Sequence, residues 1–416
     1  MSAYPKRLVT YIDTSVCDDS DLRVVSLLMT LAGIDVLSDS ITDDLWLVLA
    51  RSIRAHRDGH ACIDLRHEPS LLALVGSVPG LVAPAAERDL SPRRPFVLDD
   101  GRLYVSRAHS EETSIAVRLL ELATHERLTI LLGGPGTGKT TTVASDLVRR
   151  FEGHDVERLD IALAAPTGKA ADRMRLAVIA ALDRVRPRAE VRQRISALRA
   201  TTVHRLLGYS PSRDSGRYLY GSGNHLPHDV IVVDEASMLS MSLMHRLLDA
   251  MRPDATLMLV GDPDQLVSVD AGSVLGDIAR VEDGAVARAR TTLTVTYRFD
   301  TASSIGQLIA AIREPHPSRD DIVMSLLDSH CKPDGVLDFI RADTDQAGLG
   351  RVASMVNSWA AHMADAAAAG DVVSALTVQS TMQVLCATRR GPLGAGSWNR
   401  SVASWLGARA NRVWYP

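Results

Sequence analysis

The chain has 416 residues, of which 46% are hydrophobic and 23% are charged, and its formal net charge is −4. This length allows two or three domains with sizeable cores. The near-neutral charge excludes a histone-like, globally basic binder, but it is compatible with a local basic groove for nucleic acid.

Cysteine spacing and hydropathy exclude several further classes. None of the four cysteines lies in a C-x-x-C pair, so the sequence predicts neither a zinc ribbon nor a disulfide framework. Reduced thiols are typical of a cytoplasmic protein, which is the location we expect. Acidic residues from Asp13 to Asp19 interrupt the N-terminus, so it does not resemble a signal peptide. No apolar run approaches the ~20 residues of a membrane span, and we expect no membrane partner.

Residues 1–112 are predicted to form a small, mostly helical domain. No motif in them carries chemistry, so we expect a packing or docking role. Leu45, Leu49 and Ile53 recur at four-residue spacing, which indicates a helix that Thr42 can cap. Two short apolar runs on either side of 99–101 (Asp-Asp-Gly) predict a hairpin.

Residues 113–297 are predicted to form an α/β domain with a parallel sheet. Short apolar runs suited to buried strands alternate there with stretches long enough for crossover helices. These runs are 128–132, 160–165, 229–233, 256–260 and 291–295, and a further one lies at 383–387. Two inserts interrupt the pattern, an arginine-dense segment at 184–199 and a loop or ribbon at 213–224.

A phosphate-binding loop follows the first of these strands. Its sequence matches G-x-x-x-x-G-K-[ST] and reads Gly133, Gly134, Pro135, Gly136, Thr137, Gly138, Lys139, Thr140, with Thr141 continuing into a helix. Glycines let backbone N–H groups surround an anion, and the helix adds its positive N-terminus. We expect ATP here, with Lys139 on the β- and γ-phosphates and the Thr140 hydroxyl on Mg²⁺. The alternative is an ordinary glycine-rich turn.

Two later strand ends complete the predicted site. Four apolar residues precede Asp234, which would bind Mg²⁺, and Glu235, which would polarise the attacking water. Taken alone, such an acidic strand end would be a helix cap. A further strand ends in 261–266 (Gly-Asp-Pro-Asp-Gln-Leu), where the Gln265 amide could contact both the γ-phosphate and the water. The alternative there is a proline-containing turn.

Together these segments resemble the superfamily-one helicases, and their spelling is similar to the RecD branch, the alpha subunits of exodeoxyribonuclease V. The segments that carry the resemblance are 133–142, 165–171 with Arg173, 202–207, 234–238, 261–266, 297–299 and 386–394. They speak against a remodelling or transport ATPase, which is the other class of P-loop protein that we considered.

The resemblance implies an ATP-driven motor that moves 5′-to-3′ on single-stranded DNA in double-strand-break repair. Its partners would be the beta and gamma subunits, RecB and RecC. Thr167, Lys169 and His204 would face DNA, and Arg298 would reach the γ-phosphate. The residues alone also allow a helix cap at Thr167, a solvated Lys169, a buried His204 and a surface Arg298. The arginines of 184–199 could bind DNA phosphates or form a solvated helix face.

The sequence departs from the family in two places. The family's adenine-reading glutamine has no counterpart in 121–127, before the first strand. The family's later motifs are not found before Pro416, so we expect 298–416 to be an incomplete second RecA-like domain. The alternative function is therefore a nucleotide-binding but hydrolysis-deficient assembly or regulatory subunit.

Overall fold

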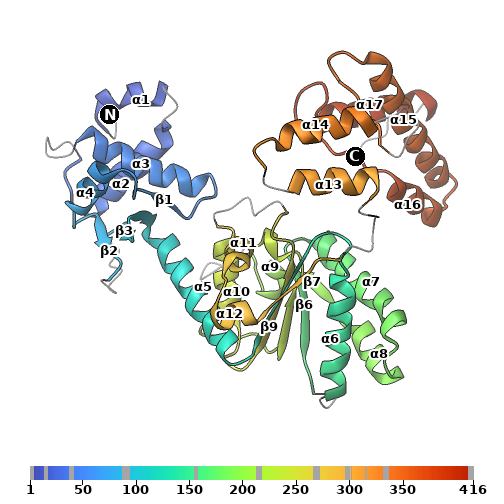
Figure 1. The fold of residues 1–416 in the computed structure, drawn as a ribbon, viewed down its shortest axis with the longest axis horizontal. Helices are drawn as coiled ribbons and strands as arrows, with labels where there is room; N and C mark the ends of the chain where they lie inside the picture. The colour runs from blue at the N-terminus through green and yellow to red at the C-terminus, as the bar shows by residue number, and fades with distance from the viewer. Residues whose placement is uncertain are drawn as a thin grey trace. The chain divides into compact units, whose positions relative to one another are not determined.

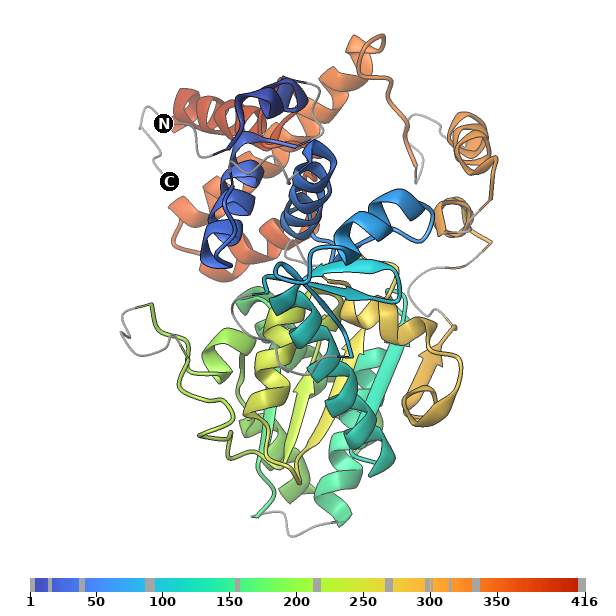
Figure 2. The same cartoon turned by 90° about the vertical axis from the view of Figure 1, so that its left-hand side faces the viewer.

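The computed structural model describes residues 4–13, 17–36, 42–86, 94–153, 158–211, 218–265, 272–295, 300, 302–313, 316–330 and 337–410. The chain divides into two compact units, Met1–Asp300 and Thr301–Pro416 (Figures 1 and 2). The three sequence-based domains, 1–112, 113–297 and 298–416, stay a prediction.

The N-terminal part of the first unit combines short helices with a small sheet. Its helices are a 3-10 turn at Lys6–Leu8, then α1 (Val9–Asp13), α2 (Asp19–Leu31), α3 (Asp43–Arg57) and α4 (Pro69–Gly76). Its strands, in spatial order, are β1 (Cys62–Asp64), β4 (Arg102–Val105), β3 (Phe96–Asp99) and β2 (Val82–Pro84). Trp46 of α3 and Phe96 of β3 are fully buried in its core.

Two local predictions for this part are confirmed. The Thr42 side chain accepts a hydrogen bond from the Leu45 amide and caps α3. Strands β3 and β4 pair in an antiparallel hairpin. Asp100 and Gly101 turn the chain there with φ of 44° and 72°, the left-handed values that a tight hairpin turn requires.

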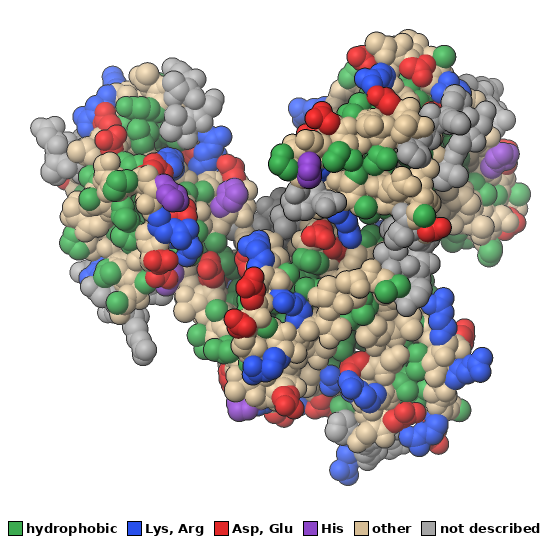
Figure 3. Space-filling model, viewed as in Figure 1, with side chains coloured by type: hydrophobic (Ala, Val, Ile, Leu, Met, Phe, Trp, Pro, Cys, Tyr) green, Lys and Arg blue, Asp and Glu red, His purple; other side chains and the backbone are tan. Residues whose placement is uncertain are grey.

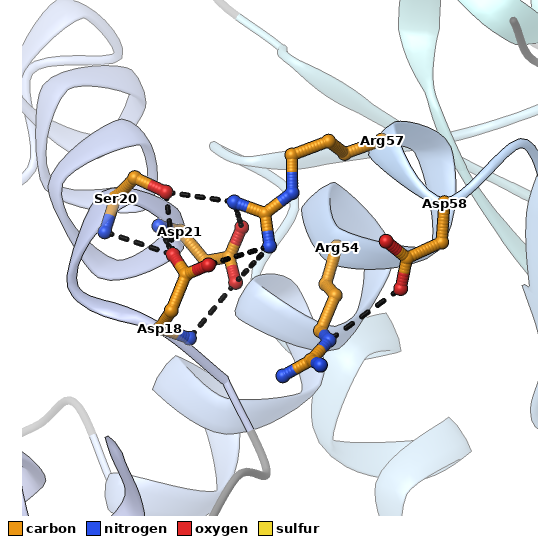
Figure 4. A network of polar contacts seen from close by, with 6 residues as sticks. All are labelled: Asp18, Ser20, Asp21, Arg54, Arg57 and Asp58. Atoms are coloured by element: carbon orange, nitrogen blue, oxygen red, sulfur yellow. Dashed lines mark hydrogen bonds and ion pairs between the residues drawn. The ribbon is translucent and has the colours of Figure 1, made fainter. Parts of the chain in front are cut away.

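A polar network joins the start of α2 to the end of α3 (Figure 4). Asp18 caps α2 by accepting bonds from the amides of Ser20 and Asp21. Arg57 donates to Asp18 at 2.6 Å and to Ser20 at 2.7 Å, and it lies 3.2 Å from the buried Asp21 carboxylate. Burial raises the pKa of Asp21, and the Arg57 charge acts in the opposite direction. The network therefore fixes these two helices against each other.

A six-stranded, fully parallel sheet forms the rest of the first unit. In spatial order its strands are β10 (Arg290–Leu293), β5 (Leu128–Gly133), β9 (Thr256–Gly261), β8 (Val230–Val233), β6 (Ile161–Ala165) and β7 (Ala200–Thr202). The five runs predicted as strands in 128–295 are confirmed, with ends shifted by up to two residues. The RecA-like arrangement expected from the P-loop is thus present.

Helices cover both faces of this sheet (Figure 1). One face carries α6 (Lys139–Gly153), α7 (Gly168–Val185) and α8 (Ala189–Ala197). The other carries α5 (Ser106–Thr124), α9 (Val203–Leu206), α10 (Met241–Ala250), α11 (Val274–Arg280) and α12 (Gly284–Arg288). Alternate residues of each strand enter the two cores, as Ile231 and Val232 of β8 do. This double burial explains why the strands are apolar throughout.

The described part of the second unit is helical. Its helices are α13 (Ser304–Arg313), α14 (Arg319–His330), α15 (Gln346–Ala368), α16 (Val372–Thr381) and α17 (Ala395–Ala410). The strand expected at 383–387 is wrong, because this segment belongs to no strand in the described structure, and Leu385 is 84% exposed. A strand forms only where a partner satisfies its backbone groups. A second RecA-like domain stays a prediction.

Candidate active site

The loop between β5 and α6 has the backbone shape that phosphate binding requires. Gly136 and Gly138 have φ of 79° and 87°, which L side chains rarely adopt. A Cβ on Gly133 would lie 2.6 Å from Thr137 Oγ1 and 2.9 Å from the Leu293 carbonyl, so only glycine fits at this turn. Thr137 is buried and donates to the Gly134 carbonyl at 2.8 Å, which braces the loop from within.

Lys139 begins α6 and points back over the loop. Its ammonium group donates to the carbonyls of Gly133 and Gly134, the latter at 3.0 Å. Thr140 and Thr141 follow in the first turn of α6 and are half-buried. The N-terminus of α6 therefore carries the lysine charge and a threonine hydroxyl in addition to the positive end of the helix dipole.

Asp234 follows β8 at the same carboxyl edge of the sheet. Burial raises its pKa, as does the neighbouring Glu235 charge, whereas the Glu235 amide bond and the charges of Lys139 and Arg173 act to lower it. Because β5, β9 and β8 run parallel in one sheet, the loop after β5 and the end of β8 lie at the same edge. A desolvated carboxylate between these groups gains from a cation, so the residues fit a magnesium-bound phosphate.

Glu235 is held in an unusual backbone conformation. Its φ of 52° is left-handed, and its amide donates to the Asp234 carboxylate at 2.9 Å. A left-handed glutamate costs conformational energy, so the surrounding structure must impose it. The chain therefore turns sharply between the two carboxylates.

The end of β9 approaches the segment after Glu235. Gly261 leaves room there for the amides of 236 and 237. The buried Asp262 accepts bonds from the Asp264 amide at 3.2 Å and from the Gln265 side chain at 3.3 Å. Gln265 is thus turned toward its own loop, and its contact with a γ-phosphate stays a prediction.

The residues expected to face DNA lie at the ends of β6 and β7. Ala165 pairs with Thr202, so Thr167 and His204 each lie two residues beyond paired positions at the carboxyl edge. Thr167 caps α7 by accepting from the Ala170 amide at 3.2 Å, which confirms its capping role. Lys169 is exposed. His204 is exposed too, so its alternative interpretation as a buried histidine is wrong.

Arg298, which was expected to reach the γ-phosphate, lies outside the described residues.

The arginine-rich insert at 184–199 forms the end of α7 and α8, where basic and acidic side chains are interspersed on the surface (Figure 3). Arg192 pairs with Asp183 at 3.0 Å, and Arg188 lies 3.9 Å from Glu152. These ion pairs favour the interpretation as a solvated helix face over that as a site for DNA phosphates.

Sequence reasoning missed two features of this edge. It did not identify β7, which positions His204. It also did not identify an exposed ring cluster around His204, whose other members come from separate segments: Tyr209, Tyr218 and Arg246. Arg173 was noted only as part of a motif, and its effect on Asp234 follows from the fold.

Comparison with known proteins identifies the family. The family model described as an AAA domain matches residues 116–271. The RecBCD enzyme subunit RecD of Mycolicibacterium smegmatis is 37% identical over 411 residues, which cover 89% of this chain and 71% of that protein. The chain belongs to the RecD family. The RecD subunit of Mycobacterium tuberculosis H37Rv is 36% identical, with 96% of this chain and 73% of that protein covered.

A second branch of relatives is also similar to this RecD family member. The ATP-dependent RecD2 DNA helicase of Deinococcus radiodurans is 34% identical over 282 residues, which cover 67% of this chain and 30% of that protein. In the part of the chain that the structure describes, no helix is both long and apolar enough to cross a membrane.

Proposed function

We propose that this RecD family member is an ATP-dependent DNA helicase subunit of an exodeoxyribonuclease V, or RecBCD-type, enzyme. It would move 5′-to-3′ on single-stranded DNA during double-strand-break repair by homologous recombination. The observation that carries the proposal is that the loop with Lys139 and the Asp234 carboxylate follow parallel strands of one sheet and so lie at the same carboxyl edge. The printed names of the relatives, RecBCD subunits and a RecD2 DNA helicase, support a helicase subunit of this type.

Several residues of this chain would take part in ATP hydrolysis, each with its own role. The loop amides and the Lys139 ammonium bind the phosphates and offset the charge that grows during transfer. Thr140 and Asp234 would hold Mg²⁺, which would supply further positive charge to the phosphate oxygens. Glu235 accepts a proton from the attacking water. Gln265 and Arg298 would contact the γ-phosphate.

DNA would lie along the carboxyl edge at the end of β6 and β7. There the exposed Lys169 offers a charge to the phosphates, and Thr167 and His204 flank it. The partners would be the beta and gamma subunits, RecB and RecC, because the relatives are named as subunits of the RecBCD enzyme.

The experiment is ATP hydrolysis by the purified chain with and without single-stranded DNA, alone and with the beta and gamma subunits. We expect DNA to stimulate turnover and the Lys139→Ala variant to lose it. Equal rates with and without DNA would count against the helicase proposal. Unchanged turnover in Lys139→Ala would refute the site. Nucleotide binding without turnover, with association with the partners retained, would favour the hydrolysis-deficient alternative.

A further inference from the structure

An exposed cluster of rings lies beside the predicted DNA path. His204 lies 5.6 Å from Tyr209 in an edge-on arrangement and 6.3 Å from Tyr218 in a stacked one, measured between ring centroids. Tyr209 and Tyr218 are 5.2 Å apart. The Arg246 guanidinium lies 4.6 Å from the centre of the Tyr218 ring. These four residues are called the ring cluster below.

The ring cluster is built on a fixed framework. Val203 and Leu207, on either side of the His204 turn, are fully buried. The Tyr209 amide donates to the His204 carbonyl at 2.9 Å and so closes the turn. The amides of Leu219 and Tyr220 both donate to the Leu207 carbonyl, at 3.0 and 3.2 Å. The Tyr218 segment is thereby fastened to the end of α9.

A glycine makes this attachment close. Gly208 has φ of 65°, and a Cβ there would lie 2.6 Å from Leu219 Cβ. The segment that carries Tyr209 therefore packs so closely against Leu219, the neighbour of Tyr218, that a side chain at 208 would clash. Rings held in this way lose little conformational entropy when a ligand stacks on them.

In the described part of the chain the ring cluster is partly exposed, while Tyr218 also packs against the core. His204 is exposed, and Tyr209 is 38% exposed. Arg246 is exposed as well and adds a positive charge. Flat aromatic faces beside a cation are the combination that single-stranded nucleic acids bind, because bases stack on the rings and phosphates meet the charge.

We propose that the ring cluster is a stacking site for a base of single-stranded DNA, with Tyr209 and His204 as its ring faces. The inference rests on the proposed function, since it places the base beside the Thr167–Lys169 edge. It adds contact with a base to the phosphate contacts of that edge. Stacking tolerates any base, so the site would hold the strand without reading its sequence.

The test compares two strands that differ only in their bases. Fluorescence anisotropy of the full chain is measured with labelled oligothymidylate and with an abasic phosphodiester strand of equal length. We expect the full chain to bind oligothymidylate more tightly. The Tyr209→Ala and His204→Ala variants should each weaken oligothymidylate binding about 5- to 150-fold, the range for one lost stack, and weaken abasic binding much less. The Tyr209→Phe variant, which keeps the ring, should retain the preference.

The abasic strand separates failure of the inference from failure of the function. Equal affinity of the full chain for the two strands, or equal weakening of both by Tyr209→Ala and His204→Ala, would overturn the stacking site and leave DNA binding intact. Binding of neither strand would overturn the proposed function itself. Because His204 is exposed, His204→Ala reports on stacking even if Tyr209→Ala lowers the stability of the fold.

Discussion

Gly261, the last residue of β9, approaches Leu275 of α11 so closely that a methyl group in place of its hydrogen would lie 2.5 Å from Leu275 Cδ2. The same methyl group would lie 3.3 Å from the amides of Ala236 and Ser237. This close approach holds the turn after Glu235 against the sheet. The conformation of Asp234 and Glu235 thus depends on the absence of a side chain at Gly261 on the neighbouring strand.

Replacement of Gly261 by Ala is therefore expected to lower the free energy of unfolding by about 1–3 kcal/mol, the usual range for overpacking. It should also slow ATP turnover, because 236 and 237 must shift. Urea unfolding and steady-state ATPase assays measure the two effects. Gly76→Ala is the control, since a Cβ there meets nothing within 4 Å. Equal stabilities of the two variants would contradict the packing argument.

Glu235→Gln should separate nucleotide binding from turnover. Glutamine keeps the shape of the side chain but cannot accept the proton of the attacking water. Turnover should fall about 10²–10⁴-fold, the usual contribution of a general base, with little change in ATP affinity. Single-turnover hydrolysis and calorimetric titration check the two quantities.

The control for Glu235→Gln is Asp264→Asn, which removes an exposed carboxylate from the neighbouring loop. That variant should hydrolyse ATP at close to the original rate. If Glu235→Gln did so too, Glu235 would not be the general base.

Local sequence predicted the parts of the fold that local chemistry determines. The P-loop, the Thr42 cap and the hairpin at Asp100 each depend on a few neighbouring residues. Strand β7 was missed because it has three half-buried residues and exists only through pairing with β6. The segment 383–387 has strand-like composition, but pairing is not encoded locally.

In the candidate site too, residues within local motifs could be predicted and residues brought together by the fold could not. The identities of Lys139, Asp234 and Glu235 followed from motifs, because each motif lies within one stretch of chain. The ring cluster could not be predicted, since Tyr218 reaches His204, and Arg246 reaches Tyr218, only after α9 and α10 pack on the sheet. Exposure of His204 likewise depends on tertiary structure.

Arg57 offers a test of the N-terminal network. Arg57→Leu should destabilise the fold, because it removes the guanidinium that pairs with the buried Asp21 carboxylate. Adding Asp21→Asn should recover part of the loss, since the uncompensated charge is then gone. Arg23→Leu, which breaks only the exposed pair with Asp19, should have a smaller effect. Thermal unfolding of the four proteins gives the order, and a larger loss in Arg23→Leu would refute it.

Arg51 and Glu68 predict a pH dependence of stability. Two parallel bonds of 2.9 Å join the guanidinium to the carboxylate, and they hold the pKa of Glu68 below its ordinary value of 4.5. A lowered folded-state pKa gives stability that is present above pH 4.5 and is lost as the pH falls through the folded-state value. The contribution should be below about 1 kcal/mol, because both side chains are about one third exposed and water screens them.

The Glu68→Gln variant isolates this effect. Its free energy of unfolding should lie below that of the original chain at pH 7, and the difference should shrink as the pH is lowered below 4.5. The double variant Arg51→Met/Glu68→Gln is the control, since it lacks the ion pair at every pH and should show the same reduced acid dependence as the single variant. Urea unfolding at several pH values measures all three proteins. A difference between the original chain and Glu68→Gln that stays constant from pH 7 to pH 3 would exclude a stabilising role for the ionised Glu68.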